Sequence, residues 1–215
     1  MKNWWYYYKW YVICGIIILC IAIRLIGGAL GLWEKKPDLQ IAYVGSSALP
    51  QDTVSALENA FASLTGDFNG DGEVIVKVNL YTDDLPYADA ESFYYEYASE
   101  VALIGDISDC ESYFFLMDNP EHFQREFQLL ASPDGGCPEE TDFSVVDKVI
   151  AWSDCSLLST MELGSYNSMI LGETQTGTNQ ELLSGLYLGR RCFYEENTTD
   201  NLEDCNALWN MLTAD

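Results

Sequence analysis

Residues 39–80, LQIAYVGSSALPQDTVSALENAFASLTGDFNGDGEVIVKVNL, contain two apolar segments separated by a stretch with helical periodicity. The first segment, 39–44, is continuously apolar apart from Gln40 and predicts a short buried strand. The second, 73–80, alternates apolar and polar residues, which predicts a strand with one buried face. The apolar stripe of the helix after Pro50 consists of Val54, Leu57, Ala60, Phe61 and Leu64. Strand, helix and strand in this order predict a βαβ unit with parallel strands.

The same alternation continues along the chain. Residues 88–104 have helical periodicity, 112–117 (SYFFLM) form an apolar run typical of an interior strand, and a further helix begins at Pro120. In the 88–104 helix we expect Phe93, Tyr97, Val101 and Leu103 or Ile104 to face inward. Later strands are predicted over 146–152 and 186–194, an exposed loop over 172–179 and a helix over 201–212. These elements predict an α/β fold, a three-layer domain with a mostly parallel sheet, over residues 39–215.

Residues 11–33, YVICGIIILCIAIRLIGGALGLW, are long enough to cross a bilayer as a helix. Their twelve Val, Ile and Leu residues outweigh the cost of Arg24. Aromatic residues gather before the span and Trp33 ends it, a pattern typical of a retained transmembrane helix. A cleaved signal peptide with its site near 27–29 is the alternative. We therefore predict a tail over 1–10, a transmembrane helix over 11–33 and a linker over 34–38.

Charge divides the chain unevenly. Residues 1–36 hold five basic side chains and one acidic one, whereas the remaining residues hold five basic and 33 acidic ones. The slight basic excess before the span favours a cytoplasmic N-terminus, a cell-membrane location and a domain on the extracytoplasmic side. A domain this acidic repels phosphate backbones, so we expect no nucleic-acid partner.

Few motifs point to catalysis or to metal binding. The chain has one histidine, His122, and no phosphate-binding glycine loop or nucleophile elbow, so we expect no catalytic residues and no cofactor. Residues 67–72 match the start of a calcium loop, D-x-N-x-D-G, but Val78 stands where the closing acid is needed, so we expect a turn and no metal. Arg190-Arg191 can bind an anion or pair with nearby acids such as Glu195 and Glu196, and we favour the second.

Seven cysteines are distributed over both parts of the chain. Cys14 and Cys20 lie in the apolar span, and five others follow in the domain, an odd number that cannot form a complete disulfide framework within one chain. No CxxC pair is present. We interpret the domain cysteines mainly as small buried side chains, with room for one or two bridges.

Residues 39–131 resemble the opening of the first lobe of bacterial extracellular solute-binding proteins, the type II periplasmic-binding fold. The similarity consists of the strand LQIAYVG, the helix LPQDTVSALENAF, the strand EVIVKVNLYTDD, a long helix and SYFFLMDNPEHF. The whole domain also resembles uncharacterised single-span envelope proteins of Gram-positive bacteria. This resemblance implies a non-catalytic, membrane-tethered protein that binds a solute. Because family members have two lobes and are much longer, a single-lobe module that docks an envelope protein is the alternative.

In open parallel sheets, ligands bind beyond the carboxyl ends of the strands. The polar and aromatic residues at four such ends form our candidate ligand-binding set. They are Ser46, Ser47, Tyr81, Asp83, Asp118, Asn119, Trp152 and Asp154. Hydroxyls, an amide, carboxylates and two aromatic faces suit a sugar or an amine-bearing solute, although ordinary loop composition explains the same residues.

Overall fold

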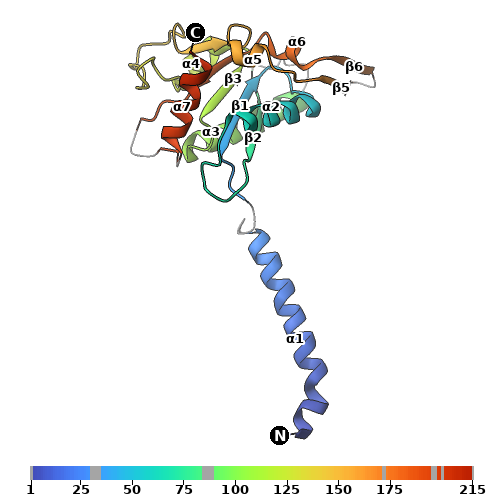
Figure 1. The fold of residues 1–215 in the computed structure, drawn as a ribbon. Helices are drawn as coiled ribbons and strands as arrows, with labels where there is room; N and C mark the ends of the chain where they lie inside the picture. Colours follow the sequence, from blue (N-terminus) through green and yellow to red (C-terminus); the bar gives the residue numbers. More distant parts are fainter. Residues whose placement is uncertain are drawn as a thin grey trace. The chain divides into compact units, whose positions relative to one another are not determined.

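A computed structural model covers the chain and describes residues 2–29, 35–83, 90–170, 173–194, 198–199 and 201–214. The chain forms two compact units, Met1–Lys36 and Pro37–Asp215. The helices are α1 (Lys2–Ala29), α2 (Gln51–Leu64), α3 (Ala90–Asp109), α4 (Pro120–Phe127), α5 (Ser156–Ser159), α6 (Asn179–Leu183) and α7 (Leu202–Leu212). The strands are β1 (Leu39–Gly45), β2 (Val76–Thr82), β3 (Phe114–Met117), β4 (Val149–Ala151), β5 (Ser165–Ile170), β6 (Glu173–Thr178) and β7 (Tyr187–Arg190) (Figure 1).

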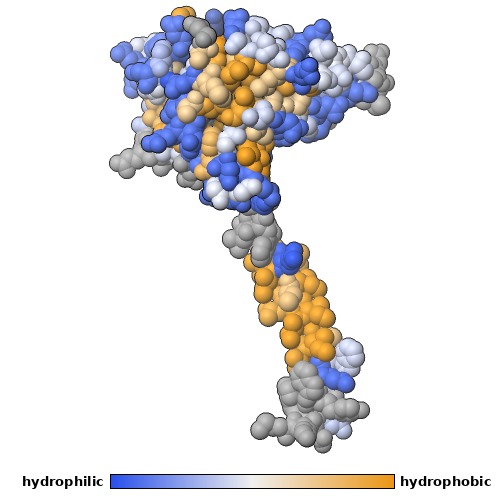
Figure 2. All heavy atoms as spheres, in the orientation of Figure 1, coloured by the Kyte–Doolittle hydropathy of each residue, from blue (hydrophilic) through white to orange (hydrophobic). Residues whose placement is uncertain are grey.

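The first unit consists mainly of α1. Within it, Tyr7–Ile26 is long and apolar enough to cross a membrane, and none of this segment is buried against other parts of the protein. Figure 2 shows its described side chains as a nearly continuous hydrophobic surface. Length and composition are shared by transmembrane helices and signal sequences near an N-terminus, so they establish the apolar helix and not its role. Trp33 and Glu34, the first residue of the predicted linker, lie outside the described residues.

The second unit is a mixed α/β fold around a five-stranded sheet in the order β2-β1-β3-β7-β4. β1 lies between β2 and β3 and is parallel to both, as the βαβ pattern predicts. β7 pairs antiparallel with β3 and with β4, so four of the five strands point the same way. The fourth strand predicted from the sequence is therefore not a neighbour of β3, because the last strand of the chain inserts between them.

Each face of the sheet carries a separate apolar cluster, because side chains alternate along the strands. On one face Ile41 and Tyr43 of β1 pack with residues of α2, α5, α6 and α7. On the other face Ala42 and Val44 pack with Leu103 of α3 and Phe123 of α4. β2 is an edge strand, so Leu80 is exposed although Val76 and Val78 are buried.

The buried side of α3 differs from the predicted one. Phe93, Tyr97, Val101 and Ile104 are each about half exposed, and Leu103 is the residue of the predicted stripe that is buried. The rotation follows from Asp106, which is 3% exposed. Its Oδ1 accepts from the Ser112 backbone N–H at 2.9 Å, and its Oδ2 accepts from Ser112 Oγ at 2.6 Å and Tyr81 Oη at 2.9 Å. A buried carboxylate must keep such donors, and keeping them turns the aromatic stripe to solvent.

Residues 153–184 form elements that the sequence pattern does not reveal. The predicted loop over 172–179 is wrong at 173–178, because β5 and β6 pair antiparallel as a hairpin from Ser165↔Thr178 to Ile170↔Glu173. The hairpin extends away from the five-stranded sheet (Figure 1). The seven cysteines are free thiols, and Cys155, Cys192 and Cys205 are buried.

Asp106→Asn tests the role of this carboxylate in orienting α3. The amide cannot accept from all of the donors now bound to Asp106, so we expect the free energy of unfolding in urea to fall by about 3 kcal/mol. Asp109→Asn makes the same change at an exposed position of the same helix, and we expect it to alter stability by less than about 0.5 kcal/mol. Equal effects of the two substitutions would contradict the interpretation.

Candidate functional site

The carboxyl ends of β1 and β3 are joined by a polar contact. Asp118 Oδ2 accepts from the Ser46 backbone N–H and from Ser46 Oγ, both at 2.7 Å. Gly45 permits this close approach, because a Cβ there would lie 3.2 Å from Asp118 Oδ2 and would collide with the Tyr43 hydroxyl. Burial and the Asp118 charge raise the pKa of Tyr43 to about 12, and its hydroxyl donates to the Ser47 carbonyl at 2.7 Å. The predicted residues Ser46, Ser47 and Asp118 are thus brought together.

Asp83 and His122 form a second pair, near the same carboxyl ends of the parallel strands. His122 Nε2 lies 3.4 Å from Asp83 Oδ2, and both side chains are partly exposed. Asn119 caps α4 by accepting the His122 backbone N–H at 3.1 Å. These residues and Ser46, Ser47 and Asp118 form what we call the strand-end rim. Within it Ser46 Oγ contacts a carboxylate and not the imidazole, so the rim shows no activated hydroxyl.

The remaining predicted residues do not join the strand-end rim. Trp152 is fully buried, and its indole Nε1 donates to Gln180 Oε1 at 2.8 Å. Tyr81 is also buried, and its hydroxyl is bound to Asp106. Neither ring offers a stacking face to a ligand at the surface. Asp154 is exposed in the turn after β4, and its Oδ1 accepts from Ser153 Oγ at 3.3 Å.

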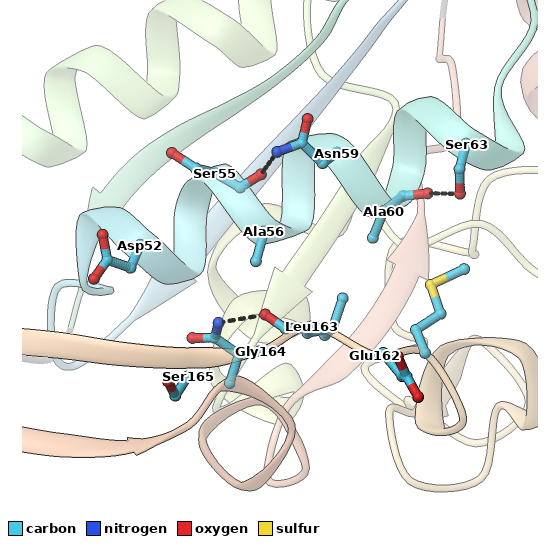
Figure 3. Close-up of a pocket in the computed structure, with 12 residues that line it drawn as sticks. Asp52, Ser55, Ala56, Asn59, Ala60, Ser63, Glu162, Leu163, Gly164 and Ser165 are labelled. Carbon is cyan, nitrogen blue, oxygen red and sulfur yellow. Dashed lines mark hydrogen bonds between the residues drawn. The ribbon is translucent and has the colours of Figure 1, made fainter.

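A cavity of about 600 Å³ lies along α2, away from the residues chosen from the sequence. Figure 3 shows it between α2 and the segment 162–165, with Asp52 and Glu162 toward opposite ends. We call it the α2 cavity. Its α2 wall is a helical stripe of small and polar side chains. The stripe consists of Asp52, Ser55, Ala56, Asn59, Ala60 and Ser63.

Two neighbouring amides hold the opposite wall in place. Asn179 is 1% exposed; its Oδ1 accepts from Thr53 Oγ1 at 2.7 Å, and its Nδ2 donates to the Leu163 carbonyl at 2.7 Å. Gln180 Nε2 donates to the carbonyls of Leu158 and Met161. The wall is therefore fixed to α2 and to the core by bonds that a ligand does not have to form, which lowers the cost of binding.

The α2 cavity is rich in hydrogen-bond acceptors. Its lining includes the carboxylates Asp52 and Glu162 and several hydroxyls and amides, and none of the described residues that line it is Lys, Arg or His. Asp52 Oδ2 already accepts the Asn167 backbone N–H at 3.1 Å, which ties β5 to α2. Acceptors without a neighbouring cation suit a ligand that carries an ammonium group or hydroxyl donors.

The acidic loop over residues 67–73 is held together by its own side chains. The described part of the chain contains no group of three or more His, Cys, Asp or Glu side chains arranged to hold a metal ion. In the 67–73 loop the carboxylate of Asp67 accepts the backbone N–H groups of Gly70, Asp71 and Gly72. Those bonds make the segment a turn stabilised by its own side chains.

No protein-family model matches the chain, and no match was found among the curated proteins or the solved structures. The candidate sites therefore stand on geometry alone. The sequence does contain a signal for the α2 cavity, since small and polar residues recur at helical spacing from Asp52 to Ser63. The partner segment has no such signal, because its position depends on the amides of Asn179 and Gln180.

Trp152→Ala distinguishes a core residue from a ligand platform. Because the indole is fully buried, we expect the free energy of unfolding to fall by about 3–5 kcal/mol. Trp152→Phe keeps most of the packing and loses the bond to Gln180, so we expect a loss of about 1–2 kcal/mol. The exposed neighbour change Asp154→Ala is the control, and urea unfolding of all three provides the measurement. A Trp152→Ala variant as stable as the parent would contradict this placement.

Proposed function

We propose that the chain is a membrane-anchored, non-catalytic binding protein whose α2 cavity takes a small amine-bearing solute. The observation that carries this proposal is a cavity of about 600 Å³ with a carboxylate toward each end and no basic side chain among the described residues of its lining. A volume of this order suits a small molecule. Of the two ligand types expected from the sequence, a sugar or an amine, the paired carboxylates favour the amine.

The proposal includes the arrangement of the whole protein. The Pro37–Asp215 unit would be a three-layer α/β domain, since helices contribute to apolar clusters on both faces of its sheet. α1 would be its membrane anchor. Lys2 and Lys9 precede the predicted span over residues 11–33, which favours a cytoplasmic N-terminus and a domain on the extracytoplasmic side.

Ligand binding without catalysis is favoured by the state of the polar groups. In the strand-end rim, Ser46 Oγ donates to Asp118 and His122 faces Asp83. In the α2 cavity, Ser63 Oγ donates to the Ala60 carbonyl at 2.6 Å, and no histidine lies nearby to act as its base. Among the described residues, neither place pairs a serine hydroxyl with a histidine base.

Titration of the full chain in detergent micelles with putrescine, glucosamine and glucose tests the binding proposal. We expect both amines to raise the melting temperature and to give saturable heats by calorimetry, because the ammonium group pairs with Glu162 and Asp52. Glu162→Gln removes one of these charges and should weaken putrescine binding by about tenfold.

Glu126→Gln is the matched control, since Glu126 is exposed on α4 and does not line the cavity. Equal affinities for putrescine in the parent, Glu162→Gln and Glu126→Gln would mean that the cavity is not the amine site. Tighter binding of glucose than of either amine would reverse the choice of ligand class.

A second candidate function is that of a protein-docking module. Its supporting observation is the exposed aromatic and aliphatic face of α3, where Phe93 packs edge-on against Tyr94 with ring centroids 5.9 Å apart. Tyr97, Val101 and Ile104 continue this face, and each is about half exposed. Contiguous apolar surface of this kind is typical of interaction sites. This function would be favoured over solute binding if the full chain captured a protein partner, if Tyr97→Ser abolished that capture, and if putrescine did not bind.

Membrane anchoring has its own test. We expect the expressed full chain to remain in the membrane pellet after alkaline carbonate washing, because Tyr7–Ile26 is apolar throughout its length apart from Lys9 and Arg24. Mass measurement of the mature protein should show that this segment is retained. A soluble product that begins after it would identify the segment as a cleaved signal sequence.

A further inference from the structure

A second cavity, of about 380 Å³, lies between the 133–135 loop, the end of β7 and α7. Arg190 in its wall pairs with Phe114, the first residue of β3, whereas the strand-end rim follows the last residue of β3. The two sites are therefore at opposite ends of β3. We call this second site the Arg190 cavity.

The two arginines of this cavity are buried without an acidic partner. Arg190 is 6% exposed and Arg191 is 5% exposed. Within the described ranges neither arginine forms an ion pair with an acidic side chain, and the pairs His122–Asp83 and Lys148–Asp142 involve other residues. Glu195 and Glu196, the partners favoured from the sequence, lie outside the described residues. A buried cation needs compensation from another source.

Arg191 obtains that compensation from the end of a helix. Its guanidinium donates to the carbonyls of Asp106 and Ile107 in the last turn of α3 and to the carbonyl of Ser112. The carboxyl end of a helix carries partial negative charge, so it stabilises a cation. Arg191 is thus a structural cap of α3.

Arg190 has no comparable source of negative charge. It donates to the carbonyls of Ser132 at 3.3 Å and Pro133 at 2.8 Å and to Asn206 Oδ1 at 3.1 Å. Tyr113 is a further hydrogen-bonding neighbour, and the Trp209 ring centroid lies 5.6 Å from the Arg190 Cζ, so the partners of this buried cation are all neutral groups. Burial raises the pKa of the adjacent Tyr113 to about 12, so the phenol is neutral at pH 7 and is not a counter-ion.

Asn206 supplies a second donor. Its Oδ1 accepts from Tyr113 Oη at 2.7 Å as well as from Arg190, which fixes the orientation of the amide. Its Nδ2 group has no hydrogen bond to another described residue. Gly135, with φ +89°, lies over the guanidinium, and a Cβ there would start 3.5 Å from Nη2. Glycine therefore leaves the guanidinium accessible from the cavity.

We propose that the Arg190 cavity binds a small carboxylate, held by the guanidinium of Arg190 and the Nδ2 group of Asn206. Asp134 selects among anions. Its carboxylate lies in the cavity wall with Oδ1 accepting the Gly136 N–H at 2.9 Å, so an anion with two charges meets more repulsion than one with a single charge. A singly charged carboxylate is preferred to phosphate.

Calorimetric titration of the full chain in detergent micelles with sodium acetate tests the proposal, with sodium chloride holding ionic strength constant. We expect saturable acetate binding and a rise in melting temperature that chloride alone does not give. Asn210→Asp adds a carboxylate at an exposed position of the cavity wall and should weaken acetate binding by at least about tenfold.

Asn206→Asp provides a second variant, because its carboxylate would serve as an internal counter-ion for Arg190. We expect it to be at least as stable as the parent in chloride and to lose the response to acetate. Gln51→Glu makes the same change of charge at an exposed position remote from this cavity in sequence, and it should bind acetate as the parent does. Circular dichroism confirms that each variant is folded.

Three results would overturn the proposal. If acetate changes the melting temperature no more than chloride does, the neutral oxygens around Arg190 are enough to stabilise its charge, and no carboxylate ligand is needed. Undiminished acetate binding by folded Asn210→Asp would place the anion elsewhere. Phosphate binding as tight as acetate binding would exclude the selectivity assigned to Asp134.

Discussion

The buried carboxylate of Asp106 is the constraint on which the arrangement of this domain depends. It accepts hydrogen bonds from Ser112 and Tyr81 and lies 3.3 Å from Asn79 Nδ2, so it ties the end of α3 to β2 and to the start of β3. Arg191, which follows β7, binds the backbone carbonyls of the same helical turn. A charge removed from water is stable only with such partners, so these elements have one mutually compatible position.

The position of β7 follows from this constraint. It places different side chains at the two ends of the strands. Because Arg191 must reach the end of α3, the preceding strand lies beside β3 and runs antiparallel to it. One end of the strands then holds the strand-end rim, whose carboxylates are Asp83 and Asp118. The opposite end receives the guanidinium of Arg190.

Hydrophobic periodicity predicts the helices and strands that depend on neighbours in the sequence. It fails where buried polar groups determine how those elements pack. The βαβ order and the parallel orientation of β1, β2 and β3 follow from short-range patterns, and so does the expectation that Ser46 and Asp118 lie at strand ends. The exposed stripe of α3 could not be predicted from hydrophobicity, because Asp106 overrides it. Trp152 was assigned to a strand end, yet its bond to Gln180 of α6 places it in the core. Such partners are far apart in the chain.

The acidity of the domain affects the two cavities in opposite ways. Residues 37–215 carry 33 acidic and five basic side chains, so their field concentrates cations and repels anions beyond contact distance. The α2 cavity gains from this field, since its carboxylates and the surrounding surface attract the same kind of ligand. An anion at Arg190 must instead cross an unfavourable field to reach a short-range attraction. Burial makes that attraction strong because water screens it poorly, which is why an arginine at this end of the strands must be shielded to act on an anion at all.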